Sequence, residues 1–600
     1  MKKYILMIVS SLMLVSCLDT IILPDDKTVD EDFWKTKEDV SSMVNAAYAA
    51  MASEDVITRL IIWGDYRSDE LVRSSSLSGT IIDALDEMAA VNIQTSNQFA
   101  TWAAFYDVIN KCNIVLERAE AVQQVDPSYT EYDYESDRCQ MLALRSLCYF
   151  YLVRNFHDVP YVTEAFMNSS QNTQYEQSSP EYVISQLIET LEEVSANPNA
   201  LRSNSFTTSE WRRVGWMTLD GVNALLADIY LWRASVLHSA ADYQKCADYC
   251  QLVIDSKRAQ HVRDRNELQE SLYPLTRNIN SGNAFRALYV DQNGEESIFE
   301  LQSKSNVGLC KYFYKYSNNN STEGYLKASS VFGQAASTLS GVGAATVFAV
   351  NDLRFYNACY FDSKTDGGSF DVRKMVSTVG LTAKTQQVRS NDRAYDSYDQ
   401  NYIIYRLPDV MLMQAEAMTQ LLQATPADAT DSVKNVISEA NAAQLQQIFN
   451  LVQAVNSRSL HSDNVADSMK WTTYRRYSKD QMETLILQER LRELCFEGKR
   501  WYDLLRYNYR HIEGVQYGRT FGEMAETAET SDSNLGLPAV YKEMLKLMTR
   551  SRGTDASAIQ AKMHNEAYLY LPIPEADFNV CPLLRQNPAY QSTNAYEKQY

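Results

Sequence analysis

The chain has 600 residues and a formal net charge of -20, with 45% apolar and 22% charged residues. These are the proportions of an ordinary globular protein. The acidity argues against nucleic acid or anionic lipid headgroups as partners. After residue 17, no run approaches the ~18 continuous apolar residues that indicate a membrane-spanning helix.

The first 17 residues have the pattern of an export signal. Lys2 and Lys3 precede an apolar run from Tyr4 to Leu14, which is shorter than the ~20 residues needed to cross a bilayer. A small residue, Ser16, then stands directly before Cys17. This order is typical of a bacterial lipoprotein signal and predicts removal of residues 1–16 and lipidation of Cys17, which anchors stably when more than one acyl chain is attached. The alternative is an ordinary secretory signal with an incidental cysteine.

The mature chain begins with a polar tether over residues 17–32 and then becomes helical. Residues 33–256 are expected to form an N-terminal helical region, in which the last two helices make an αα-hairpin that resembles a tetratricopeptide unit. Residues 257–400 are rich in Gly, Asn, Ser and Tyr and predict folded loop with minor strands, such as 297–302, before helices resume in 401–600. The apolar periodicity predicts helices over 40–51, 102–121, 138–156, 222–237, 242–254, 407–422 and 433–455.

The strongest helix signal follows Ser478 and Gln481, which form a capping box. The predicted helix reaches about Tyr507, and its apolar stripe includes Gly498, where the missing side chain would let another helix approach closely. No CxxC occurs among the ten cysteines. Several of them lie in apolar helical stripes, so few or no disulfides are expected.

Five segments in register along the chain resemble those of the SusD/RagB family. The helix 488–507 carries the family pattern in QERLRELCFEGKRWYDLLRY, and the others are 33–51, 144–164, 405–418 and 570–590. The departures are His157 and Ala589, where the family usually has Gly. The helix pattern is carried here by Glu489, Arg490, Glu493, Glu497, Gly498, Arg500, Trp501, Asp503 and Leu504.

The resemblance implies a mostly α-helical fold with tetratricopeptide-like helix pairs and an irregular, loop-rich half with minor β-strands that faces the ligand. It also implies a lipid-anchored protein on the outer membrane, facing the cell exterior. There it would act with a SusC-like TonB-dependent β-barrel transporter as its partner. The usual ligand in the family is an oligosaccharide, although some members take peptides.

The three motif glutamates also permit a catalytic interpretation. Glu489, Glu493 and Glu497 share one helix face, and a carboxylate pair can perform acid–base chemistry. Because arginines interleave with them, structural ion pairing with near neighbours on the helix is favoured. No HExxH, GxSxG or P-loop occurs, and the six histidines have no metal-ligand spacing. We therefore predict no cofactor; acidic loops could bind Ca²⁺, but no EF-hand pattern supports it.

Two regions are candidate ligand contacts. Tyr312, Tyr314 and Tyr316 alternate, so an extended segment would place all three on one face, with Tyr325 following; the alternative is a half-buried strand whose rings pack on helices. The second region begins with a stretch around Asp69 and Arg73 that resembles a charged ligand-contacting stretch of the family, with a structural turn as the alternative, and it continues into the following loop. Sequence alone does not show whether the two regions converge. The second region comprises Asp69, Arg73, Asn92, Asn97 and Phe99.

Together these features predict a surface lipoprotein that binds an oligosaccharide without covalent chemistry and delivers it to the transporter. The aromatic side chains would stack on the C–H faces of sugar rings, and polar side chains would meet the hydroxyls. One alternative is the same scaffold binding peptides for uptake. A glycan-cleaving enzyme is the other, but no carboxylate pair stands in a cleft-like context.

Overall fold

The computed structural model describes most of the chain between residues 33 and 590. The predicted signal, Cys17 and the tether lie outside the described residues, as do Tyr314 and Tyr316. The description covers 33–590 apart from 75–78, 169, 266–271, 277–282, 304–311, 314–323, 333–346, 349–351, 361–370, 373, 377–398, 427, 461–467 and 528–534.

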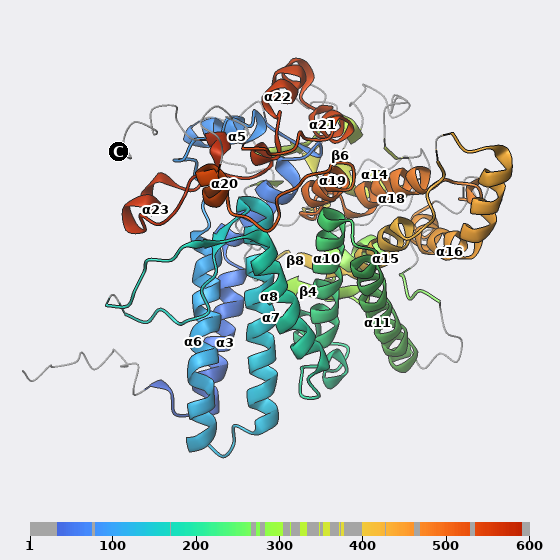
Figure 1. Ribbon diagram of the computed structural model, residues 1–600. Coiled ribbons are helices and arrows are strands. Elements are labelled where there is room, and N and C mark those ends of the chain that lie inside the picture. Colours follow the sequence, from blue (N-terminus) through green and yellow to red (C-terminus); the bar gives the residue numbers. More distant parts are fainter. Residues whose placement is uncertain are drawn as a thin grey trace, which may run out of the picture.

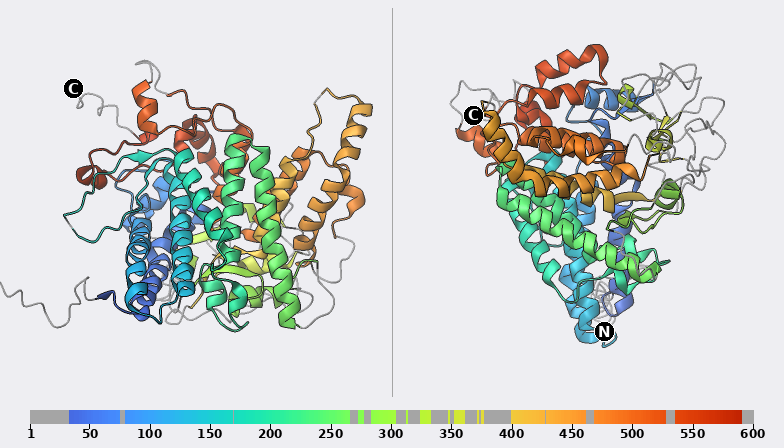
Figure 2. Two further views of the ribbon diagram at one scale, coloured as in Figure 1. Left: turned by 60° about the horizontal axis from the view of Figure 1, so that its bottom comes forward. Right: turned by 90° about the vertical axis from the view of Figure 1, so that its right-hand side faces the viewer.

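Long helices packed side by side form the N-terminal half (Figure 1). The first helix packs on α6, α6 on α7, and α7 on α8, while α10 and α11 form the hairpin expected from their sequence. The right-hand view of Figure 2 shows the molecule narrowing toward the turn between α6 and α7. The elements are α3 (Lys37–Met51), α4 (Glu54–Ile61), the π-helix η1 (Ile62–Tyr66), α5 (Thr80–Ala89), α6 (Ala103–Val125), α7 (Glu131–Phe156), α8 (Pro180–Ala196), α9 (Arg212–Gly215), α10 (Leu219–Leu237) and α11 (Ala240–Arg265).

The ends of α7 show why this sequence forms that helix. Thr130 and Asp133 make a capping box at its start, which satisfies two amide groups that the helix cannot. It ends at His157, whose φ of 71° lies in the left-handed region that favours glycine. The His157 ring stacks on Phe521 at 4.2 Å and its Nδ1 lies 2.8 Å from Asp158 Oδ1. These contacts stabilise His157 in a backbone conformation that is unfavourable for histidine, at the position where the family usually has Gly.

The C-terminal half packs further helices on this array and carries short strands. As predicted for 297–302, β4 (Ser297–Leu301) is a strand; it pairs antiparallel with β8 (Tyr402–Arg406). The described helices are α12 (Asn283–Phe285), α14 (Leu353–Ala358), α15 (Leu407–Gln420), α16 (Asp431–Ser457), α17 (Trp471–Tyr474), α18 (Lys479–Leu494), α19 (Arg500–Tyr509), α20 (Phe521–Thr527), α21 (Lys542–Thr549), α22 (Ala556–Lys562) and α23 (Glu575–Val580). The remaining strands are β1 (Leu71–Arg73), β2 (Val159–Pro160), β3 (Gln177–Ser178), β5 (Leu326–Ala328), β6 (Cys359–Tyr360) and β7 (Asp371–Val372).

The single helix predicted from Ser478 to about Tyr507 is wrong. The capping box is present, but the helix breaks between α18 and α19, where Phe496 and Gly498 have φ of 65° and 71°. The reversal is held from outside the helix, because the Phe496 amide donates to Glu70 and the Gly498 amide to Asp65. The apolar stripe therefore belongs to two helices.

One continuous apolar core joins both halves, from Val40 on α3 to Leu584 near the C-terminus. The eight cysteines in the described part of the chain are buried and free, as expected for small apolar residues. Within the described ranges, no helix has the length and hydropathy needed to cross a membrane.

Candidate ligand-binding site

The two regions proposed from sequence meet in a short antiparallel strand pair. Strand β1 runs beside β5, with Leu71 opposite Ala328 and Arg73 opposite Leu326. A further bond joins the Ser74 amide to the Tyr325 carbonyl at 2.9 Å. Arg73 and Tyr325 are thus brought together although they lie far apart in the sequence, and we call this pairing the β1–β5 junction.

Helix α5 connects the β1–β5 junction to the loop that follows it. The guanidinium of Arg73 donates to both carboxylate oxygens of Asp86 on α5, with Nη2 3.1 Å from Oδ2. One helix position later, Glu87 accepts from the Asn97 amide group at 2.8 Å. Arg73, α5 and the loop 91–99 consequently form one continuous surface.

The candidate contacts differ in their access to solvent. Arg73 keeps 34% of its side chain exposed, Tyr325 is half-buried and Asn92 is exposed. The Asn92 side-chain oxygen accepts from Lys562 on α22 at 2.7 Å. These three are the described candidates that a ligand could reach without rearrangement.

Three other candidates are buried, which argues against direct contact with a ligand. Asp69 is fully buried, and its carboxylate accepts from Arg500 at 2.9 Å and from Arg550 at 2.6 Å. Burial raises the pKa of Asp69, but the two guanidinium groups outweigh it and the pKa is lowered. Asn97 bonds the Ala84 carbonyl, and Phe99 is 3% exposed. These residues instead hold the backbone on either side of the surface.

The predicted row of tyrosines on one strand face is not seen in the described residues. Tyr312 is helical and only 4% exposed. Its ring meets that of Tyr325 edge-on, with centroids 5.4 Å apart and planes at 89°. The Tyr312 ring therefore packs against the Tyr325 ring, which fits the packing alternative for this position.

The motif glutamates lie in a buried network of ion pairs, as favoured from sequence. However, most partners are distant in the chain rather than neighbours on the helix. Only Arg492 pairs locally, with Glu489 at 2.6 Å. Glu493 pairs with Arg354 at 2.9 Å and with Arg406 and Arg458, and Glu497 pairs with Arg406 at 2.7 Å and with Lys374.

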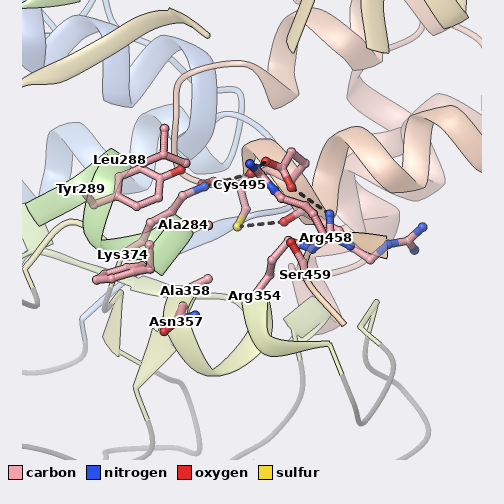
Figure 3. A pocket seen from close by; sticks show the side chains of 13 residues that line it. Ala284, Leu288, Tyr289, Arg354, Asn357, Ala358, Lys374, Arg458, Ser459 and Cys495 are labelled. Carbon is pink, nitrogen blue, oxygen red and sulfur yellow. Dashed lines mark hydrogen bonds and ion pairs between the residues drawn. The ribbon is translucent and has the colours of Figure 1, made fainter. Parts of the chain in front are cut away.

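This network surrounds a cavity too small for a sugar. Figure 3 shows Arg354, Lys374 and Arg458 converging around it. Its volume is about 40 Å³, which is room for a few water molecules. Burial raises the pKa of Glu493, but its three guanidinium partners outweigh burial and hold it well below the ordinary value. A carboxylate held ionised in this way is a poor general acid.

The motif also fixes the segment that leads into β1. A Cβ on Gly64 in η1 would lie 2.3 Å from the Gly498 carbonyl oxygen, so the two glycines permit the close approach expected at Gly498. Asp65 accepts from the Gly498 amide at 2.8 Å, and Arg500 binds Asp69 two residues before β1. The motif thereby positions the strand that carries Arg73.

Sequence reasoning missed the residues that complete this surface. Asp86 and Glu87 lie on α5, and Lys562 lies on α22, neither of which was predicted as a helix. The apolar spacing of Ile81, Ala84, Leu85 and Met88 was a usable signal for α5. Nothing local signals that Lys562 meets Asn92.

Models of two known protein families match this chain. The model described as "SusD family" matches residues 342–590, and the model described as "Starch-binding associating with outer membrane" matches residues 22–207. The chain belongs to the SusD/RagB family. The first match includes the buried charge motif, and the second includes β1 and α5, whereas β5 lies between the two matches.

Individual SusD-like proteins agree over nearly the whole chain. SusD-like protein P38 of Formosa agariphila is 25% identical over 530 residues, covering 85% of this chain and 92% of the relative. The surface glycan-binding protein A of Bacteroides uniformis has a TM-score of 0.59 at 18% identity, covering 93% of this chain and all of that one. A SusD superfamily protein of Bacteroides thetaiotaomicron has a TM-score of 0.58 at 18% identity, covering 93% and 99%. The mostly helical, tetratricopeptide-like fold is thus confirmed.

Family membership also sets a coarse function. SusD-like proteins bind glycans rather than transform them, work in general with SusC-like transporters, and associate with the outer membrane. In the part of the chain that the structure describes, no group of three or more His, Cys, Asp or Glu side chains is arranged to hold a metal ion.

Proposed function

We propose that this protein captures an oligosaccharide at the cell surface and delivers it to a SusC-like TonB-dependent transporter. The observation that carries the proposal is the β1–β5 junction, which brings a partly exposed arginine and a half-buried tyrosine together in a SusD-like chain. Sugars offer apolar faces to aromatic rings and hydroxyls to charged groups. Binding of this kind needs no covalent step.

Arg73 and Tyr325 have separate roles in this proposal. The Asp86 carboxylate holds the Arg73 guanidinium in place, which leaves its remaining N–H groups to donate to ligand hydroxyls. Tyr312 fixes the Tyr325 ring through the edge-on contact. Asn92 extends the polar surface along the loop after α5. Tyr314 and Tyr316 stay predictions.

The anchor and partner belong to the same proposal. Lipidated Cys17 would hold the mature chain to the outer membrane facing outward, with residues 17–32 as its tether and the two regions 33–256 and 257–600 as the capture module. The test is incorporation of radiolabelled palmitate, which Cys17→Ala should abolish, together with co-purification of a β-barrel transporter. Export with an unmodified N-terminus would refute the anchor.

Binding is tested on a glycan array followed by calorimetry with the purified mature protein. Arg73→Met should weaken binding at least tenfold, because a hydrogen bond from a charged group contributes about 1.5–3 kcal/mol. Tyr325→Ala should weaken it similarly through lost stacking. Arg286→Met removes a more exposed Arg–Asp pair elsewhere, and Tyr132→Ala removes an exposed ring; both variants should bind normally. Absence of any glycan ligand, or release of cleaved product, would contradict the proposal.

A further inference from the structure

A second cavity lies between α6, the loop 160–175 and α23. Its volume is about 500 Å³, within the ~300–1,000 Å³ range of small-molecule sites. Arg73, Asn92 and Tyr325 are not among the residues that line this cavity. In Figure 1, α23 lies at the edge of the molecule, on the side of α6. Four aromatic side chains line it, two from the start of α6 and two from the loop: Trp102, Tyr106, Phe166 and Tyr175.

Side chains of α6 hold one wall of this cavity in place. Asn110 exchanges two hydrogen bonds with the Phe166 backbone, at 2.7 and 2.8 Å. One turn along α6, Asn113 donates to the carbonyls of Val162 and Glu164 at 3.2 and 3.0 Å. The Tyr106 hydroxyl donates to the Pro160 carbonyl at 2.6 Å. This wall is built before any ligand arrives.

The opposite wall is α23, and an exposed apolar side chain stands on each side of the mouth. Gln174 donates to the Val580 carbonyl at 2.7 Å, which ties the loop to the end of α23. Phe166 and Val580 line the two sides, and they are 41% and 62% exposed. Large apolar side chains left exposed on both lips of a cavity are typical of a binding site.

The polar groups in the cavity carry one sign of charge. Its carboxylates are Asp107, Glu164 and Asp577, and the described lining includes no Lys or Arg. Asp107 forms an ion pair with Lys111, which does not line the cavity. Asp577 Oδ2 is buried and forms no hydrogen bond of good geometry in the described part of the structure. Burial raises the pKa of this carboxyl, and the neighbouring Trp102 side chain opposes that effect. A donor from a ligand would complete the hydrogen bonding of Oδ2. Glu164 lies exposed at the rim.

We propose that this cavity binds a primary ammonium group carried on a ring or apolar chain, with Asp577 and Glu164 as its anionic partners. Aromatic faces attract cations, and a carboxylate in an apolar cavity adds a charged acceptor. The same chemistry is offered by an amino sugar and by a lysine side chain of a peptide. Acidic sugars are disfavoured because the described lining contains three carboxylates and no Lys or Arg.

Calorimetry on the mature protein tests the proposal with four probes. They are the β-1,4-linked glucosamine disaccharide, its N-acetylated form, the dipeptide Lys-Tyr and the same dipeptide with both amines acetylated. The free amines should bind at least tenfold more tightly than their acetylated forms. Binding of only the disaccharide or only the dipeptide identifies the source of the ammonium group.

Matched variants assign the binding to the cavity. Asp577→Asn and Phe166→Ala should each weaken amine binding at least tenfold, whereas the exposed controls Asp431→Asn and Tyr132→Ala should leave it unchanged. Val580→Ser, at an exposed position, serves if Asp577→Asn does not fold. Equal binding of acetylated and free amines, no binding at millimolar concentration, or full affinity in the cavity variants would overturn the proposal. Arg73→Met should not affect it, which separates this site from the β1–β5 junction.

Discussion

Glu493→Gln tests whether the motif glutamates act as structural charges. Glu493 faces Arg354 at 2.9 Å and also pairs with Arg406 and Arg458, all of them buried. The glutamine removes the charge at constant size and presents an N–H group toward guanidinium donors. Breaking a buried ion pair from one side costs about 3–5 kcal/mol.

The expected loss lies near the lower end, at about 3 kcal/mol, because each arginine retains a second carboxylate. Arg406 keeps Glu497 and Arg458 keeps Glu296. Urea unfolding followed by circular dichroism measures the loss. The control is Glu543→Gln, whose partner Lys546 is 62% exposed, so that its loss should stay below about 1 kcal/mol.

The pH dependence sharpens this test. The pKa of Glu493 is lowered in the folded protein, so its contribution is present above the ordinary value and is lost as the pH falls through the folded value. The difference between Glu493→Gln and wild type should therefore be constant at neutral pH and shrink only below pH 4.5. Equal losses in Glu493→Gln and Glu543→Gln at pH 7 would refute the structural role.

Two further predictions concern the contact between η1 and the reversal after α18. Gly498→Ala should destabilise the fold by about 2–5 kcal/mol, because the new Cβ would lie 2.4 Å from Tyr402 Oη at a φ of 71°. Gly553→Ala, at a φ of 55° with nothing within 4 Å, isolates the backbone cost of about 1–2 kcal/mol in the same unfolding assay; equal losses would exclude the clash. For the buried pair Asp65 and Glu70, burial raises both pKa values, that of Asp65 to about 7. Raised values stabilise the fold at low pH, so the free energy of unfolding should fall between pH 4 and 7, by up to about 1.4 kcal/mol per pH unit for each group. Urea midpoints across this range should lose that fall in the double variant Asp65→Asn, Glu70→Gln, and an unchanged slope would contradict the assignment.

Helix positions were predictable because their signals are local. Apolar periodicity and the capping box at Ser478 act within a few turns, and the helices expected from them are present. The break after Leu494 is different, because the amides of Phe496 and Gly498 are satisfied by Glu70 and Asp65 from a distant segment. The spacing of apolar residues does not depend on such long-range hydrogen bonds, so it cannot predict the break.

The candidate site was predicted only in part for the same reason. The two regions were identified from residue types, but their meeting depends on strand pairing between Arg73 and Leu326. Arg73 is partly exposed whereas Asp69 is buried, so only Arg73 can contact a ligand directly. The positions of the two residues in the sequence do not reveal this difference. The alternating tyrosines predicted a strand, yet Tyr312 is helical and buried, with its ring against that of Tyr325.

The distribution of carboxyl groups bears on the rival interpretation of the motif as a catalytic one. Proton transfer to a glycosidic oxygen needs a carboxylic acid with a raised pKa beside a space that admits a sugar ring. The motif glutamates have lowered pKa values around a cavity of about 40 Å³. Asp65 and Glu70 have raised values, but both are fully buried beneath the Gly498 reversal. The motif glutamates thus meet neither requirement, and Asp65 and Glu70 meet only the first, whereas both groups hold η1 and the start of β1 in place. The charged residues of this motif are therefore better explained by the geometry they give to the β1–β5 junction than by bond cleavage.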